Sequence, residues 1–188
     1  MANEPLDDRR KALENSFFAK QEKKLLAQLR EKKQAETNQQ ELMEVSGITD
    51  AAILATLVRL GIGAETLAAL SLAPLVAVAW ADGTVDDKER TTILAAAAEI
   101  GIQPHHIGYQ LVETWLAHRP SRDLDQAWDD YVGSLNDVLT PAERNALRDD
   151  LLSRARRVAE ASGGILGLGN KVSKPEQAVL KRLAAAFD

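Results

Sequence analysis

The 188-residue sequence contains no cysteine and few aromatic residues. Without cysteine the chain cannot form disulfides or thiolate metal sites, and it has no cysteine nucleophile. Aromatic residues make up only 4% of the chain, so a hydrophobic core must consist mainly of alanine, leucine, isoleucine and valine. The net charge of −5 argues against a general nucleic-acid-binding protein.

The sequence also lacks an apolar run long enough to cross a membrane. Its most apolar stretch, residues 66–81, carries no charge until Asp82 but includes Pro74. It is shorter than the roughly 20 residues that a spanning helix needs. Residues 1–10 are charged and have no apolar segment typical of a secretion signal. We therefore expect a cytoplasmic protein without a membrane span.

No segment has the alternating pattern of a β-strand, whereas apolar residues recur at helical spacing along most of the chain. We therefore predict an all-α protein. A compact helical domain over residues 45–188 is preceded by a long amphipathic helix and linker over residues 1–44. Charge supports a division near this point. Residues 1–40 have a net charge of +2, and residues 41–188 have a net charge of −7.

The first 34 residues are predicted to form one amphipathic helix, because large apolar residues follow one another at spacings close to whole helical turns. Its apolar face consists of Leu6, Leu13, Phe17, Phe18, Leu25, Leu26 and Leu29. The pattern stops after Gln34, so residues 35–40 are predicted to be frayed helix or linker. The face could fold back on the domain, pair with a second copy or dock into a groove of a partner protein. We expect fold-back or self-association before a separate partner.

Caps, glycines and prolines divide the rest of the chain into shorter helices. Pro74 predicts a break near Leu72, and a glycine-rich connector is expected over residues 163–169. The predicted helices cover residues 49–60, 65–80, 86–100, 104–118, 121–137, 140–162 and 173–187.

Three of these helices begin with the same local pattern. An apolar residue precedes a side chain that can cap the helix, and a glutamate follows three positions after that side chain. This spacing is typical of a capping box, worth about 1 kcal/mol. The pairs are Asp86 with Glu89, Thr140 with Glu143, and Ser173 with Glu176. The first and third segments match further, which is explained by an internal duplication or by two independent uses of a common helix start.

The segment from Ala79 to Arg90, Ala-Trp-Ala-Asp-Gly-Thr-Val-Asp-Asp-Lys-Glu-Arg, resembles TerB-like domains of the tellurite-resistance TerB superfamily. In that family an apolar helix ends in an Ala-Asp-Gly turn, and an acidic stretch opens the next helix. The resemblance covers residues 45–188. It implies a helical bundle, a non-enzymatic role in the stress or tellurite response, and a divalent-metal site.

Carried over residue by residue, the ligands of that metal site are Asp82, Asp86 and Glu89, with Asp87 as a neighbour. Calcium and magnesium prefer such clustered carboxylate oxygens. The third segment departs from the family pattern, because Gly169-Asn170-Lys171 replaces an Asp-Gly turn. The alternative is that Asp86 and Glu89 only cap the helix while Asp82 stabilises the turn.

The beginning of the chain resembles a second family. Asp7-Asp8-Arg9, Lys11-Ala12, Glu14 and Phe17 match the opening of the bacterial ATPase inhibitor subunit zeta over about a dozen residues. This resemblance implies an ATPase as a partner of the N-terminal helix. No Ser/His/Asp set or pair of catalytic carboxylates follows from the spacing, so we expect a protein that is not an enzyme.

Overall fold

The computed structural model describes the backbone of residues 4–162 and 172–188, and the side chains of residues 24–161 and 172–188. Within these residues the chain forms α-helices joined by turns and contains no strand, which confirms the all-α prediction. The helices are α1 (Glu4–Ser46), α2 (Ala51–Arg59), α3 (Leu67–Leu70), α4 (Ala73–Ala79), α5 (Asp87–Glu99), α6 (Ile107–Ala117), α7 (Arg122–Val138), α8 (Pro141–Ser162) and α9 (Lys174–Ala185).

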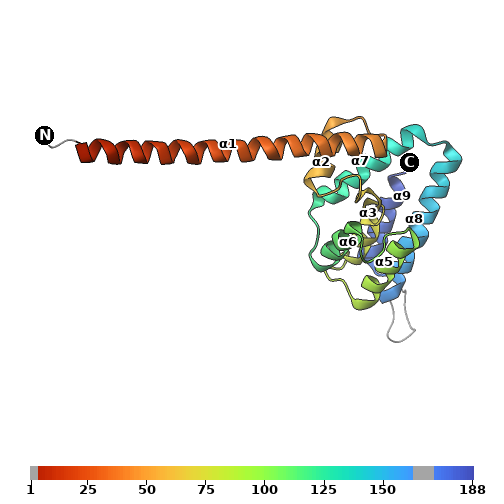
Figure 1. Ribbon diagram of the computed structural model, residues 1–188. Helices are drawn as coiled ribbons and strands as arrows, with labels where there is room; N and C mark the ends of the chain where they lie inside the picture. The colour runs from red at the N-terminus through yellow and green to blue at the C-terminus, as the bar shows by residue number, and fades with distance from the viewer. Residues whose placement is uncertain (1–3, 163–171) are drawn as a thin grey trace.

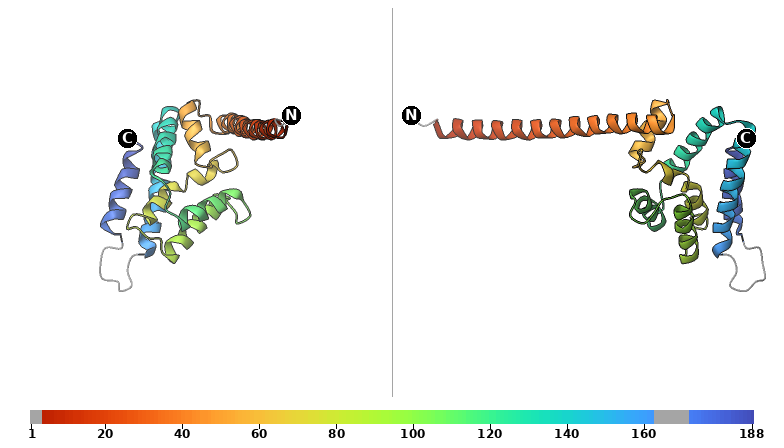
Figure 2. Two further views of the ribbon diagram at one scale, coloured as in Figure 1. Left: turned by 90° about the vertical axis from the view of Figure 1, so that its left-hand side faces the viewer. Right: turned by 45° about the vertical axis from the view of Figure 1, so that its right-hand side comes forward.

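The molecule consists of a packed body, formed by α2 to α9, and a long helix that projects from it (Figure 1). Figure 1 and the right-hand view of Figure 2 show most of α1 extending away from the body, and the left-hand view of Figure 2 looks along its axis. We call residues 4–34 of α1 the arm. At 1.5 Å per residue the arm is about 46 Å long.

Helix α4 lies at the centre of the body. Six of its seven residues are buried, and it packs against α5, α6, α7, α8 and α9. A helix that is apolar on all sides is expected in a core. Pro74 lies in the first turn of α4, where a proline is tolerated because that backbone N–H has no helical partner. The chain breaks between α3 and α4 at Ser71 and Leu72, as predicted.

Helix α1 is longer than predicted. Of the two predictions for residues 35–40, frayed helix or linker, the linker is wrong, because these residues are helical and α1 continues to Ser46. The apolar pattern does not extend over this end of α1, where Leu42 is the one fully buried side chain among the described residues of the helix. Gly47, with φ of 72°, ends the helix by donating its N–H to the Met43 carbonyl at 2.9 Å.

Other predicted boundaries agree with the structure, with two corrections. Helix α6 begins at Ile107 instead of Pro104, because residues 104–106 form a turn and bend. Ser121 stands at the N-cap of α7, but its side chain makes no capping hydrogen bond. The predicted glycine-rich connector over residues 163–169 lies outside the described residues.

Candidate functional site

The acidic turn connects α4 to α5, and each of its three candidate carboxylates has a partner in the backbone. An oxygen of Asp82 accepts the Thr84 N–H at 3.0 Å. Asp86 caps α5, accepting the N–H groups of Lys88 and Glu89 at 2.8 Å each. Glu89 reaches back to accept the Asp86 N–H at 2.9 Å. The predicted capping box is therefore confirmed, and Asp82 stabilises the turn.

Glu89 differs from its two neighbours in exposure. Asp82 and Asp86 are exposed, whereas the Glu89 side chain is only 4% exposed. Burial disfavours the ionised form and raises the pKa of Glu89 to about 7. The hydrogen bond from Asp86 lowers this pKa, while the charges of Asp86, Asp82 and Glu176 raise it further.

Glu176, at the start of α9, belongs to the same acidic region. It forms the second half of a capping box with Ser173 and is 5% exposed. Its charge raises the pKa of Glu89, so the two capping glutamates lie near each other. Sequence reasoning did not include Glu176 among the candidate ligands, although the match between the two helix starts pointed to it.

The third capping box, at the start of α8, is separate from this region. Thr140 and Glu143 bond reciprocally, with the Thr140 N–H donating to the Glu143 carboxylate at 2.9 Å. Both residues are exposed. The hydrogen bonds from Thr140 lower the pKa of Glu143, in contrast to Glu89. The same local pattern therefore has opposite electrostatic consequences at a buried and at an exposed helix start.

The predicted metal ligands do not form a complete ligand set. Among the described residues, no group of three or more histidines, aspartates and glutamates is arranged to hold a metal ion. The hydrogen bonds of Asp82, Asp86 and Glu89 use one oxygen of each carboxylate. Their turn and capping roles are established, whereas cation binding stays a prediction.

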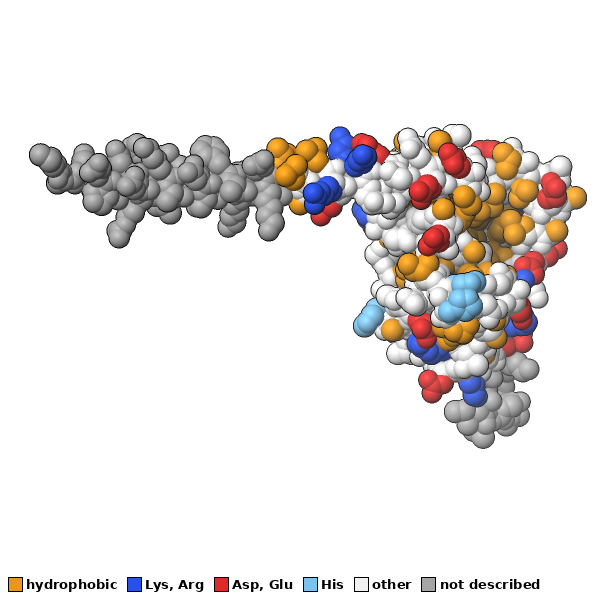
Figure 3. All heavy atoms as spheres, in the orientation of Figure 1, with side chains coloured by type: hydrophobic (Ala, Val, Ile, Leu, Met, Phe, Trp, Pro, Cys, Tyr) orange, Lys and Arg blue, Asp and Glu red, His pale blue; other side chains and the backbone are white. Residues whose placement is uncertain are grey.

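The arm presents the second candidate site. Every side chain from Lys24 to Gln34 is exposed. Leu25, Leu26 and Leu29 are 56%, 48% and 54% exposed, and we call these three the leucine patch. Figure 3 shows apolar and basic side chains together on this part of the arm. The side chains of the other predicted contact residues, Leu6, Leu13, Phe17 and Phe18, lie outside the described residues.

The leucine patch does not fold back on the body of the same copy. The first partly buried side chain along the described part of α1 is that of Ala35, and the first fully buried one is Leu42. The arm therefore leaves the body before the leucine patch is reached (Figure 1). Of the three arrangements predicted for this face, pairing with a second copy and docking on a partner stay as predictions.

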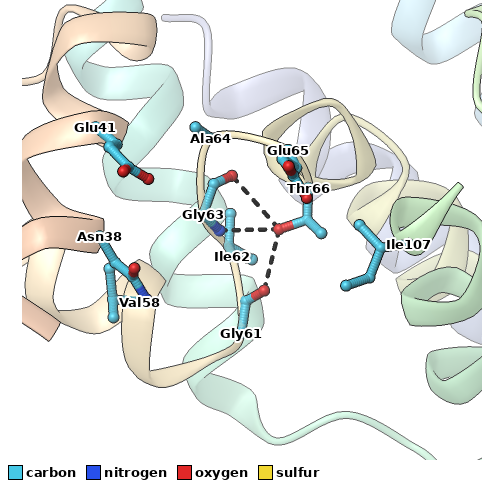
Figure 4. Close-up of a pocket in the computed structure, with 10 residues that line it drawn as sticks. All are labelled: Asn38, Glu41, Val58, Gly61, Ile62, Gly63, Ala64, Glu65, Thr66 and Ile107. Atoms are coloured by element: carbon cyan, nitrogen blue, oxygen red, sulfur yellow. Dashed lines mark hydrogen bonds between the residues drawn. The ribbon is translucent and has the colours of Figure 1, made fainter. Parts of the chain in front are cut away.

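A cavity of about 270 Å³ lies where α1 meets the body, and we call it the foot pocket (Figure 4). Asn38 and Glu41 of α1 lie on one side, and Glu65, Thr66 and Ile107 lie on the opposite side. The buried Thr66 holds the loop in place, because its hydroxyl accepts the Gly63 N–H at 2.8 Å and donates to the Gly61 carbonyl at 3.0 Å. The pocket is lined by Asn38, Glu41, Val58, Gly61, Ile62, Gly63, Ala64, Glu65, Thr66 and Ile107.

The foot pocket combines apolar walls with acidic edges. Val58 is half-buried and Ile107 is 54% exposed, so both offer apolar surface, whereas Ile62 is fully buried and offers none. The side chains of Glu41 and Glu65 are exposed. Sequence reasoning missed this pocket, because its residues come from three helices and a loop that no spacing pattern connects.

Comparisons with protein-family models, with curated proteins and with solved structures found no match. The TerB-like and zeta-subunit resemblances therefore stay predictions. No helix among the described residues is long and apolar enough to span a membrane.

Proposed function

We propose that the protein is a non-catalytic interaction module that binds another polypeptide chain through its arm. The observation that carries this proposal is the leucine patch, which the body of the same copy leaves exposed. In this view the body anchors α1 through Leu42 and holds the arm away from itself.

Helices in proteins gain most of their stability from packing an apolar face, and an isolated helix is marginal in water. The described part of the arm has no such packing, since all side chains of residues 24–34 are exposed. Covering the leucine patch would supply it, at roughly 25 cal/mol for each Å² of apolar surface removed from water.

The two family resemblances suggest a cellular setting for this module. The TerB-like turn implies a stress or tellurite response, and the zeta-like opening implies an ATPase as partner. Both are predictions about the partner and the process, whereas the arm proposal depends only on the exposed leucine patch.

A photo-crosslinking experiment tests the arm directly. A photoreactive residue replaces Gln28, which lies between Leu25 and Leu29 on an exposed turn of the arm. On illumination in the native cells, we expect a covalent adduct between the full chain and a second polypeptide. Leu25→Ala combined with Leu29→Ala should remove most of this adduct.

The matched control removes two exposed apolar side chains from the body instead. Val138 and Leu147 are 76% and 38% exposed, so Val138→Ala combined with Leu147→Ala should leave the adduct unchanged. No adduct from the native chain, or an adduct that survives the loss of both arm leucines, contradicts the proposal. The mass of the adduct reports whether the second polypeptide is another copy.

A divalent-cation site at the acidic turn is a second candidate function. It rests on the TerB-like resemblance of the turn and on the nearness of Asp82, Asp86 and Glu176 to the buried Glu89, since the described residues hold no preformed group of three ligands. A bound calcium or magnesium ion would offset the mutual repulsion of these carboxylates and would favour the ionised form of Glu89. The ion would then bind more tightly as pH rises through neutrality, because it competes with a proton.

Calorimetric titration of the full chain with calcium and with magnesium tests this candidate. Binding should release a fraction of a proton near pH 7 and should therefore change in heat with the ionisation enthalpy of the buffer. Asp82→Asn combined with Glu89→Gln should abolish it, while Glu143→Gln at the exposed box serves as the control. The cation candidate fails when the native chain gives only dilution heat, or when the double variant binds as the native chain does.

A further inference from the structure

Two segments of α1, one basic and one acidic, follow each other along the helix. Residues 20–30 contain four Lys/Arg and one Glu, whereas residues 36–46 contain three Glu and no Lys/Arg. Within the basic segment, Lys24 and Arg30 flank the leucine patch and are exposed. Within the acidic segment, Glu41 forms an edge of the foot pocket.

The leucine patch and the foot pocket also match in chemistry. The patch offers leucine side chains between two cations, and the pocket offers apolar walls between the carboxylates of Glu41 and Glu65. An apolar centre with complementary charges at its rim is the usual composition of a protein interface. The patch therefore fits the pocket better than it fits a basic or a wholly apolar surface.

The two surfaces cannot meet within one copy. Both belong to the continuous helix α1, because Asn38 and Glu41 of the pocket are themselves α1 residues. Leu25 and Glu41 are separated by 16 positions, which corresponds to about 24 Å along a helix axis. The arm can therefore reach this pocket only on another molecule.

We propose that the arm of one copy docks on the foot pocket of a second copy, with Leu25 and Leu29 against the apolar walls and Lys24 and Arg30 beside Glu41 and Glu65. This inference rests on the proposed function, since it names the chain that covers the leucine patch. In a two-fold symmetric pair the same contact forms twice, and the assembly closes as a dimer.

Charge favours this arrangement over direct in-register pairing of two arms. Parallel arms would place the basic segment of one molecule beside the same basic segment of the other, and like charges in contact are destabilising. Docking at the foot pocket places the basic segment of each arm beside the acidic end of the other α1. Because the rim pairs are exposed to solvent, the dimer should weaken as salt is added.

Sedimentation equilibrium on the full chain tests the inference through a charge swap. Lys24→Glu combined with Arg30→Glu should weaken the dimer by about tenfold or more. Glu41→Lys combined with Glu65→Lys should do the same. All four substitutions together restore opposite charges across the interface and should recover dimerisation.

Two further measurements keep this test decisive. Near-ultraviolet circular dichroism of Trp80, Trp115 and Trp128, which all lie in the body, establishes that the body of each variant keeps its native packing even where an uncovered arm loses helix. Glu160→Lys, at an exposed glutamate of α8, serves as the control that should leave the dimer unchanged. A native chain that stays monomeric, or a dimer that neither charge reversal weakens, overturns the inference. When the chain is monomeric but Gln28 still crosslinks to a polypeptide of another mass, the arm function stands and this inference alone fails.

Discussion

Glu89 shows how one side chain can serve a local structural role at an electrostatic cost. Burial favours its neutral form, and the nearby charges of Asp86, Asp82 and Glu176 act in the same direction. The hydrogen bond from the Asp86 N–H favours the ionised form but is the weaker influence. The result is a carboxyl group that caps α5 and changes charge near neutral pH.

This balance predicts a definite pH dependence of stability. The pKa of Glu89 is about 7 in the folded protein, above its ordinary value of 4.5, so between these values the folded state holds a proton that the unfolded chain has released. Protonated Glu89 contributes fully to the free energy of unfolding below pH 4.5. This contribution, up to about 3 kcal/mol, is lost as pH rises to about 7. Glu89→Gln keeps an acceptor for Asp86 but cannot ionise, so its free energy of unfolding should decrease less over this range.

Urea denaturation at several pH values between about 4.5 and 7.5 measures this difference. Glu143→Gln is the matched control, because the pKa of Glu143 is lowered rather than raised. The ionised Glu143 stabilises the folded state at pH values above its ordinary pKa, whereas Glu89 stabilises it at low pH. Glu143→Gln therefore removes a contribution whose pH dependence has the opposite sign. Parallel stability profiles for Glu89→Gln and the native chain would contradict our assignment of Glu89.

At the scale of elements, the helix starts were the most predictable feature. The caps of α5, α8 and α9 depend on residues three positions apart, and all three boxes form. Ser121 shows the limit of such reasoning. Its position at the start of α7 was predictable, but whether its hydroxyl reaches the free N–H groups depends on the conformation of the chain after Pro120, and it makes no such bond.

Two serine substitutions compare an N-cap whose side chain accepts a capping hydrogen bond with an N-cap whose side chain accepts none. Ser173→Ala removes a hydroxyl that accepts the Glu176 N–H at 3.3 Å and should reduce the free energy of unfolding by about 1 kcal/mol. Ser121→Ala removes no capping bond and should change it by only a few tenths of a kcal/mol. Chemical denaturation of both variants measures the difference, and equal losses would show that the cap geometry is not the cause.

The acidic region was only partly predictable for a related reason. The spacing of Asp82, Asp86 and Glu89 identified the turn and the cap, because both are local. The approach of Glu176 depends on how α9 packs in the body, where α9 contacts both α4 and α8. No periodicity in the sequence carries that information.

At the scale of the whole molecule, the basic arm and the acidic body were evident from charge, but the path of α1 was not. Between Leu29 and Leu42 the sequence has no large apolar residue, so the pattern gave no sign that one helix joins arm and body. The direction of the arm is set where α1 packs against α2 and ends at Gly47. That geometry leaves the leucine patch exposed, and under the proposed function another chain covers it.

Amide hydrogen exchange across residues 24–34 measures this claim most directly, because an uncovered helix opens easily while a packed one resists exchange. We expect slow exchange at these amides in the native assembly, and exchange faster by at least about tenfold when Leu25→Ala and Leu29→Ala are combined. The body amides should be unchanged in that variant. Equally rapid exchange in both proteins would show that nothing covers the arm and that the proposed function is wrong.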